Sequence, residues 1–448
     1  MATPRSVAFH TLGCKLNFSE TSTIRRQFEE AGFSVLDFED GADYYVLNTC
    51  SVTDFADRKC RYEVRRAQKH NPTAKVIVVG CYAQLKPDEI ADIEGVDLVL
   101  GAAEKFNILN HIDTLHDISG QSKIRAGDIH HVNSFIDAFS VGDRTRSFLK
   151  VQDGCNYKCA FCTIPLARGK SRSDTVENVV ANVKEIAQKG VQEIVLTGVN
   201  IGDFGNGTEV IEGLKPKKEA LFIDLIKALE KVEGVNRYRI SSIEPNLCNE
   251  EIIDFVANSE KFMPHFHMPL QSGSNEILKS MRRRYKSELY SERVAYIKSV
   301  MPHCCIGVDV IVGFPGETDS HFQETYDFLL SLDISYLHVF TYSERANTHA
   351  VEKEGKVPMG VRKERNKKLR ILSEKKRRAF YNSHIGTTRP VLLESKSQDG
   401  LLTGFTDNYI KVEVDENTMS ENQLIECNMI EVSEKTLMKA HVVTASIG

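Results

Sequence analysis

The sequence lacks any apolar run of the roughly 20 residues that a transmembrane helix needs. Its first residues, MATPRSVAFHTLG, contain neither the apolar core nor the small-residue cleavage site of a secretory signal peptide. A strong net charge is also missing, since 57 Lys and Arg stand against 62 Asp and Glu, a balance of −5. Any nucleic-acid site must therefore be a local patch, because no whole-molecule field draws the chain to polyanions. We expect a cytoplasmic protein without membrane contact.

Cysteine, by contrast, is plentiful, with eleven among 448 residues. The cytoplasm keeps thiols reduced, so these cysteines do not indicate a disulfide framework. Six of them lie where loops begin. The other five lie inside periodic or apolar segments, where plain burial is the expected role: Cys60, Cys248, Cys304, Cys305 and Cys427.

The pattern of apolar residues divides the chain into three parts. Residues 5–101 alternate short apolar runs with amphipathic stretches, which predicts a small doubly wound α/β sheet that is largely parallel. A weakly patterned connection over 103–140 leads to six further β-like runs separated by helical stretches, which fit an open or partial βα barrel. From Arg389 onward, short strands predict a small antiparallel β-barrel.

One short loop carries Cys155, Cys159 and Cys162 in the spacing C-x3-C-x2-C. Three such thiolates can bind three irons of a cubane cluster and leave the fourth iron open to a substrate. Zinc is an alternative, although it needs a fourth ligand and no histidine occurs between His131 and His265. Inert packing is the third interpretation, and the density of cysteines directly after an apolar strand argues against it.

A second triplet, Cys14, Cys50 and Cys81, is dispersed in sequence, but each member follows an apolar run and then a polar residue or glycine. The carboxyl ends of parallel strands share one edge of a sheet, so these cysteines are expected to converge within ligand distance. The alternative is three unrelated small residues at strand ends.

The loop of Cys155, with Phe161 just before its third cysteine, closely resembles the signature of the radical S-adenosylmethionine (SAM) enzymes. The resemblance implies a partial (β/α)6 barrel, SAM chelated by the open iron, and electron transfer that cleaves SAM to a 5′-deoxyadenosyl radical. Further family-like stretches follow β runs at Gly313–Thr318 and at two places that give candidate cofactor-binding residues: Thr197, Gly198 and Asn200, then Gln271 and Ser272.

The N-terminal cysteine segments resemble those of the methylthiotransferases, a radical SAM subgroup with two [4Fe-4S] clusters. The resemblance rests on Gly13–Glu20 and Asn48–Cys50, and Gly404–Tyr409 resembles the RNA-binding TRAM domain of the same family, an OB-like barrel. It implies that Cys14, Cys50 and Cys81 hold an auxiliary cluster that supplies sulfur. It also implies three domains: an N-terminal methylthiotransferase domain (3–115), a radical SAM core (141–372) and the TRAM domain (373–442).

A basic stretch from Val361 to Phe380 carries ten Lys or Arg against two acidic residues. Since only Glu364 and Glu374 are available as partners within it, an RNA-binding helix is favoured over a solvated helix with internal ion pairs. Tyr381 and Tyr409 could stack on bases, although packing is the commoner role. Arg168 is a candidate for a phosphate or SAM carboxylate contact, or for a structural ion pair.

Within the family, Gly13–Glu20, Val151–Cys155 and Ile164–Gly169 most resemble the bacterial branch that methylthiolates C2 of N6-threonylcarbamoyladenosine at tRNA position 37. The resemblance implies tRNA, SAM and a flavodoxin- or ferredoxin-like electron donor as partners. Two alternatives within the family are isopentenyladenosine-37 and a ribosomal protein side chain. An alternative from another class is a zinc-stabilised RNA-binding protein without catalysis.

Overall fold

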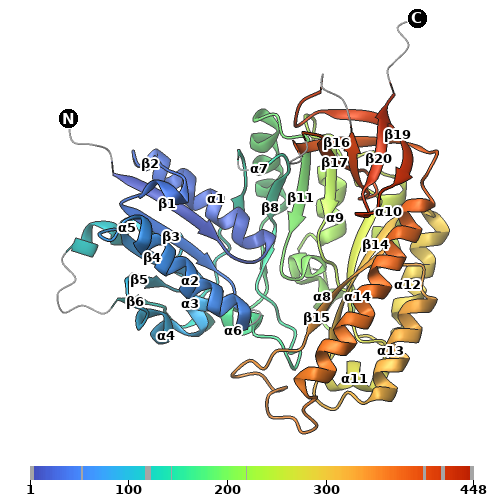
Figure 1. The fold of residues 1–448 in the computed structure, drawn as a ribbon, viewed down its shortest axis with the longest axis horizontal. Helices are drawn as coiled ribbons and strands as arrows, with labels where there is room; N and C mark the ends of the chain where they lie inside the picture. Colours follow the sequence, from blue (N-terminus) through green and yellow to red (C-terminus); the bar gives the residue numbers. More distant parts are fainter. Residues whose placement is uncertain are drawn as a thin grey trace, which may run out of the picture.

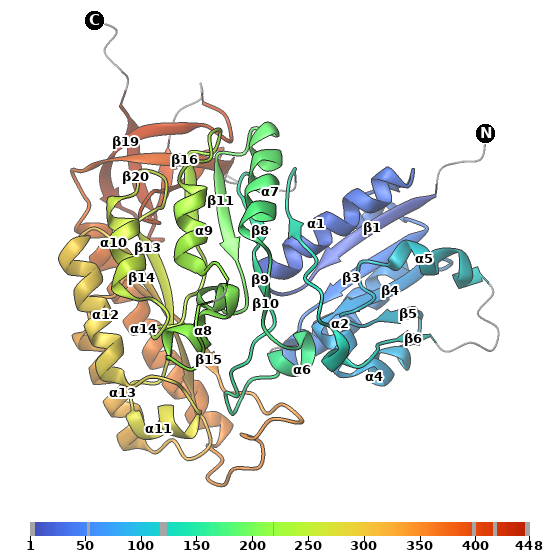
Figure 2. The same ribbon diagram turned by 180° about the vertical axis from the view of Figure 1, so that it is seen from behind.

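The computed structural model of the chain describes residues 5–51, 54–116, 123–142, 144–217, 219–396, 400–414 and 419–443. Three units follow one another along the sequence (Figure 1). The N-terminal unit lies beside the first strands of the central unit, and the C-terminal barrel lies against one end of it; the view from behind in Figure 2 shows the same arrangement. Within the described residues, no helix is both long enough and apolar enough to cross a membrane.

The N-terminal unit is a parallel sheet with strand order β2-β1-β3-β4-β5-β6. Alternate residues of its strands point into two separate apolar clusters, one on each face, as a doubly wound sheet requires. The strands are β1 (Ser6–Thr11), β2 (Ser34–Val35), β3 (Tyr44–Thr49), β4 (Lys75–Gly80), β5 (Val96–Leu100) and β6 (Ile124–Arg125). The helices are α1 (Lys15–Glu30), α2 (Asp54–His70), α3 (Cys81–Leu85), α4 (Pro87–Ala91) and α5 (Ile108–Ile112), with short 3-10 turns at Phe38–Asp40, Asp113–His116 and Ile129–His131.

The central unit is a partial barrel of six parallel strands, split between the pairings β12-β11-β8 and β13-β14-β15. Its strands are β8 (Ser147–Lys150), β11 (Glu193–Thr197), β12 (Arg237–Ile240), β13 (His265–Gln271), β14 (Cys305–Val312) and β15 (Tyr336–Thr341), with β7 (Ala138–Phe139), β9 (Gln152–Asp153) and β10 (Arg172–Ser173) beside them. The helices are α6 (Ile164–Arg168), α7 (Val176–Gln188), a 3-10 segment (Ile201–Asn206), α8 (Gly207–Ile211), α9 (Phe222–Leu229), α10 (Glu250–Asn258), α11 (Asn275–Ser280), α12 (Ser287–Val300), α13 (Asp319–Ser331) and α14 (Met359–Asn382).

The C-terminal unit is a closed barrel with the strand order β16-β17-β18-β20-β19. Side chains of the central unit fix it in place, since Arg237 and Arg239 donate to backbone carbonyls of Pro390, Phe405 and Asp407. Its strands are β16 (Thr388–Lys396), β17 (Leu402–Thr406), β18 (Lys411–Val414), β19 (Leu424–Val432) and β20 (Met438–Val442).

The N-terminal unit contacts both ends of the partial barrel. On one side, α1 packs against β7 and β8. On the other side, Arg345, which follows β15, donates to Ser51 Oγ at 2.5 Å and to Asp57 Oδ2 at 2.9 Å. Because β8 and β15 are the two terminal strands of the six-stranded arc, the N-terminal unit bridges its open side.

The predicted fold class is confirmed, and all six predicted barrel runs are strands. Two strands were missed within 103–140: β6 extends the first sheet and β7 extends the second. Each has two residues, too few for a periodic pattern. The C-terminal barrel was predicted to be antiparallel, and it is so except for β18 and β20, which pair in parallel.

Candidate active site

The loop of Cys155, Cys159 and Cys162 connects β9 to α6. It leaves β9 through Gly154, whose φ is +69°, and a Cβ at this position would lie 2.0 Å from the Lys170 carbonyl oxygen. Only glycine fits there without displacing backbone. Two backbone hydrogen bonds hold the loop at its centre: Ala160 N donates to Met281 O at 2.9 Å, and Ala160 O accepts from Ala350 N at 2.8 Å.

All three thiols of this loop are partly buried, and burial raises their pKa values, that of Cys162 to about 12. Bare thiols would therefore stay protonated at neutral pH. Cys159 has a cationic neighbour, since Arg283 Nη1 donates to its Sγ at 3.1 Å, while the same guanidinium is paired with Glu244. A positively charged metal centre would supply the rest of the stabilisation that thiolates need here.

The candidate SAM-binding stretches lie at the carboxyl ends of their strands. Gln152 joins the first of them to the cysteine loop: its Oε1 accepts from Asn200 N at 2.9 Å and its Nε2 donates to Gly154 O at 2.7 Å. The side-chain amide of Asn200 is buried, and neither its oxygen nor its nitrogen has a hydrogen-bond partner within the described structure. A buried amide without partners fits a site built for a polar ligand.

The remaining candidates are placed as follows. Thr197 Oγ1 donates to Leu149 O at 3.0 Å, a structural bond, and Gly198 lies against Gln152. Gln271 ends β13 with a φ of +70°, and the buried hydroxyl of Ser272 lies 3.2 Å from Thr325 Oγ1. The ring of Phe161 packs edge-on against Phe314 at 6.5 Å, in a small apolar cluster under the loop.

The sheet brings the second triplet to one edge. Cys14 precedes α1 directly after β1, Cys50 follows β3, and Cys81 opens α3 after β4, which are three neighbouring parallel strands. A Cβ on Gly13 would lie 2.6 Å from Cys50 Cβ and 3.1 Å from its Sγ, so the first two cysteine loops are in contact. Cys81 is buried, which raises its pKa, and the charge of Cys14 adds to that shift.

The spacing of the sulfur atoms bears on what each triplet could hold. Thiolates around a single zinc ion lie about 3.8 Å apart, given Zn–S bonds of about 2.3 Å in a tetrahedron. Among the described residues, only His267, Asp309 and His338 form a set of three ligand atoms all within 4.8 Å of one another, so neither cysteine triplet is that compact.

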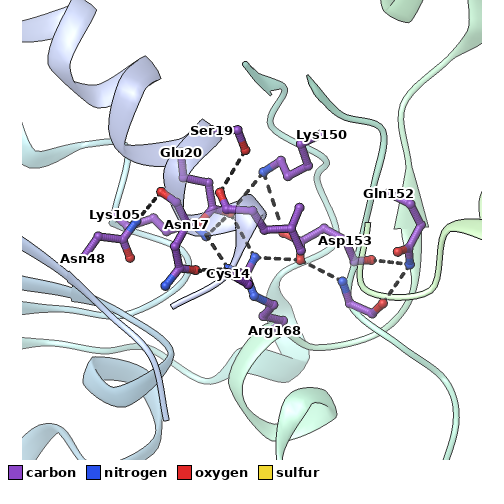
Figure 3. Close-up of polar contacts among 12 residues, drawn as sticks. Cys14, Asn17, Ser19, Glu20, Asn48, Lys105, Lys150, Gln152, Asp153 and Arg168 are labelled. Atoms are coloured by element: carbon purple, nitrogen blue, oxygen red, sulfur yellow. Dashed lines mark hydrogen bonds and ion pairs between the residues drawn. The ribbon is translucent and has the colours of Figure 1, made fainter. Parts of the chain in front are cut away.

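A buried network of charges connects the two cysteine sites (Figure 3). Its centre is Glu20 on α1, whose carboxylate contacts Lys105 Nζ at 2.6 Å, Arg168 Nη1 at 2.9 Å and Lys150 Nζ at 3.4 Å. Arg168 also contacts Asp153 Oδ1 at 3.0 Å, two residues before Cys155. All five side chains are at most 5% exposed.

Electrostatics hold this network in its ionised form. Burial alone would raise the pKa of Glu20, but the charges of Arg168, Lys105 and Lys150 outweigh it and hold that pKa well below its usual range. The pKa of Asp153 is held low in the same way. Arg172 Nη2 also contacts Asp153 Oδ2 at 3.1 Å, so four cations face two carboxylates, and the excess positive charge would compensate part of the negative charge of a thiolate-bound cluster.

Asn17 attaches this network to the auxiliary triplet. Its Nδ2 donates to Leu12 O at 2.8 Å and Thr49 O at 3.1 Å, which precede two of the cysteine loops. Its Oδ1 accepts from Arg168 Nη2 at 2.7 Å and lies 3.8 Å from Cys14 Sγ. Arg168 is thus a structural ion-pair residue, one of the two roles left open from sequence. The helix that carries it, α6, packs directly on α3 and so sets the two cysteine loops side by side.

Lys15 lies next to Cys14 at the start of α1, and it is exposed to solvent. Its pKa is nevertheless lowered to about 8, first because surrounding protein displaces water and then because Arg146 and Arg239 are near.

Other residues singled out from sequence have packing roles. The five cysteines assigned to burial are all at most 2% exposed. Tyr381 accepts a hydrogen bond from Lys411 N in a buried position, and Tyr409 stacks on His265 with ring centroids 4.3 Å apart.

The charges of the basic stretch, now part of α14, were expected to be largely unpaired, and this was wrong for several of them. Arg362 pairs with Glu344, and Arg365 pairs with Glu317 and Asp319, all outside the helix. Pairing within the stretch could be judged from sequence, whereas pairing across elements could not. Lys363, Lys367 and Arg370 stay exposed and line one shallow cavity of about 340 Å³.

Comparison with known families and proteins agrees with this geometry. Residues 149–329 match the Radical SAM superfamily, and residues 6–101 match the family described as Uncharacterized protein family UPF0004. The fold resembles the radical S-adenosylmethionine methyltransferase TsrM from Kitasatospora setae, with a TM-score of 0.56 at 14% identity, covering 78% of this chain and 77% of that one.

Curated relatives give the finer assignment. Threonylcarbamoyladenosine tRNA methylthiotransferase MtaB of Bacillus subtilis (strain 168) is 41% identical, covering 91% of this chain and 90% of the relative. The Thermotoga maritima protein of the same name is 37% identical, with 93% of each chain covered. A tRNA-2-methylthio-N(6)-dimethylallyladenosine synthase of Akkermansia muciniphila is 30% identical, with 90% and 92% covered. The chain therefore belongs to the radical SAM methylthiotransferase family, in the branch of the threonylcarbamoyladenosine tRNA methylthiotransferases.

Proposed function

We propose that this protein transfers a methylthio group to C2 of N6-threonylcarbamoyladenosine at position 37 of tRNA, next to the anticodon. The observation that supports this most strongly is the pairing of two cysteine triplets across one buried ion network, within a chain similar over nine-tenths of its length to relatives of that name. Two triplets are needed because the reaction uses a radical and also consumes sulfur.

The residues present fit two [4Fe-4S] clusters and SAM. Cys155, Cys159 and Cys162 would hold the cluster that reduces and cleaves SAM, and Cys14, Cys50 and Cys81 the auxiliary cluster that supplies sulfur. When bound, these groups provide radical chemistry, which the reaction requires because the C2–H bond of adenine is not acidic enough for a side-chain base. An external electron donor of flavodoxin or ferredoxin type would serve the first cluster.

The chain's own residues would place these groups. Arg283 donates to Cys159 Sγ and would stabilise negative charge on that sulfur, while the Asn200 amide would bind SAM near the loop. Arg168 and Asn17 fix the distance between the two cysteine edges. The N-terminal unit, which bridges the open side of the barrel, would hold the auxiliary triplet beside the barrel that carries the first triplet.

The exposed face of α14 is the proposed tRNA contact. Lys363, Lys367 and Arg370 recur at helical spacing on one surface, where they could follow a phosphate backbone. We keep the division into an N-terminal domain at 3–115, a radical SAM core at 141–372 and a TRAM domain at 373–442. Helix α14 crosses the second boundary and so couples the core to the C-terminal barrel.

Mass spectrometry of tRNA nucleosides from cells with and without this gene tests the proposal. Loss of 2-methylthio-N6-threonylcarbamoyladenosine, with the unmethylthiolated nucleoside accumulating, is the expected result. Loss of the methylthio group from isopentenyladenosine, or no change in any tRNA nucleoside, would overturn it.

A further inference from the structure

Three polar side chains from neighbouring strands meet on the inner face of the partial barrel. They are His267 on β13, Asp309 on β14 and His338 on β15. The residues just before them, including Phe266 and Val308, belong to the apolar core that the strands share with the surrounding helices. Because successive side chains of a strand point to opposite faces, the three polar side chains point to the inside of the arc.

The ligand atoms of these side chains are close enough to share one metal ion. Asp309 Oδ1 lies 2.8 Å from His267 Nε2 and 3.3 Å from His338 Nδ1, and one ligand atom from each residue lies within 4.8 Å of the other two. With metal–ligand bonds of about 2.1 Å, neighbouring ligand atoms are about 3.0 Å apart in an octahedron and about 3.4 Å apart in a tetrahedron. Two of the three spacings are therefore close to those of a metal-bound set, and the half-exposed His338 ring can adjust the third.

The other ring nitrogen of His267 has an outer partner. His267 Nδ1 lies 3.2 Å from Tyr336 Oη, which in turn lies 3.1 Å from His265 Nε2. A metal-binding histidine typically donates its second N–H to such a partner, which fixes the ring and leaves the lone pair of the first nitrogen for the metal. Gly307 makes room for this contact, since a Cβ there would lie 2.7 Å from His267 Nδ1 and still closer to Tyr336 Oη.

The donor set is suited to a transition-metal ion. An ordinary ion pair accounts for one histidine beside a carboxylate, whereas here both imidazoles converge on the same oxygen, Asp309 Oδ1. Two imidazole nitrogens and one carboxylate oxygen are ligands that zinc and ferrous iron accept. The side chain of His338 is 54% exposed, so an ion can reach the site from solvent.

We propose that His267, Asp309 and His338 bind a divalent transition-metal ion at a site separate from both cysteine triplets. Three protein ligands leave at least one coordination position open to water or to an oxygen atom of a ligand inside the barrel. This inference goes beyond the proposed function and does not depend on it, because no thiolate takes part.

The test uses the holoenzyme with its clusters reconstituted, dialysed against a chelator and then supplied with one equivalent of Zn²⁺. X-ray absorption at the zinc edge identifies the ligands of zinc alone, because the iron of the clusters is not probed at that edge. Competition with a coloured zinc chelator measures the affinity. The variants are His338→Ala, Asp309→Asn and Tyr336→Phe, and the control is His441→Ala, a change at an exposed histidine of the C-terminal barrel.

The wild type should bind one zinc ion per chain through nitrogen and oxygen ligands at about 2.0–2.2 Å. Tyr336→Phe should keep these ligands and weaken zinc binding by about 10- to 100-fold, as loss of an outer partner typically does. His338→Ala and Asp309→Asn each lose a ligand and should weaken binding further. His441→Ala should match the wild type, and the iron and sulfide contents should be the same in all five proteins.

Zinc bound through sulfur at about 2.3 Å would overturn the inference, because that distance would place the ion on a cysteine triplet. Wild-type affinity in His338→Ala would overturn it as well. So would a wild type that binds no zinc, since the three side chains would then form an ion-pair cluster only. The wild-type spectrum decides the identity of the ligands without relying on the folding of any variant.

Discussion

Replacing Glu20 by Gln tests the buried network that joins the two cysteine sites. The substitution removes one of two carboxylates that face Lys105, Lys150 and Arg168, all buried. Removing one partner of a buried ion pair costs about 3–5 kcal/mol, because the remaining charge is left without compensation. For a unit of about 100 residues each kcal/mol lowers the melting temperature by about 4–8 °C, so the N-terminal transition should fall by at least about 10 °C.

Scanning calorimetry of the full chain measures this effect, and Glu29→Gln is the matched control. Glu29 lies on the same helix in an exposed i,i+4 pair with Arg25, worth about 0.3–0.5 kcal/mol. The difference in melting temperature between wild type and Glu20→Gln should also depend on pH. Because the pKa of Glu20 is held below its usual value of 4.5, its contribution is complete above that pH and is lost as the pH falls further. A Glu20→Gln transition indistinguishable from that of Glu29→Gln at pH 7 would refute the reasoning.

Three further predictions concern the cysteine loops and the tRNA surface. Cys159→Ala should abolish cleavage of SAM, whereas Cys14→Ala should abolish methylthiolation and leave some 5′-deoxyadenosine formation; normal methylthiolation by Cys14→Ala would contradict the division of roles. Gly154→Ala should destabilise the cysteine loop by about 1–3 kcal/mol because an alanine would keep the positive φ, and its Cβ would also clash with backbone at 2.0 Å. The variant should therefore retain less iron. Gly400→Ala, with open space around its Cβ, is the control for φ alone. Replacing Lys363, Lys367 and Arg370 by Gln together should lower the salt slope of tRNA binding by about 2–3, and an unchanged slope would remove α14 from the interface.

Much of the fold was predictable from the sequence because it depends on local pattern. The parallel strands are continuous apolar runs, and the rule that the carboxyl ends of parallel strands share one edge predicts Cys14, Cys50 and Cys81 at that edge. The loop of Cys155 was recognisable because its three cysteines lie within eight residues of one another.

What could not be predicted depends on contacts between distant residues. Arg168 and Glu20 are 148 positions apart, and no local pattern pairs them. For the same reason the role of Arg168 stayed open from sequence, and Asn17, Gln152 and Arg283 were not predicted as residues of the site. The partners of Arg365 lie on the loop before α13 and at its start, so a charge count along one helix overestimated the number of free cations.

The central claim is that each triplet of thiolates holds its own cluster. Iron and acid-labile sulfide analysis of the anaerobically purified protein tests it most directly, alongside a variant with Cys14, Cys50 and Cys81 all replaced by Ala. We expect about eight irons per wild-type chain and about four in the variant. About four irons in both proteins, or zinc in place of iron, would contradict the claim.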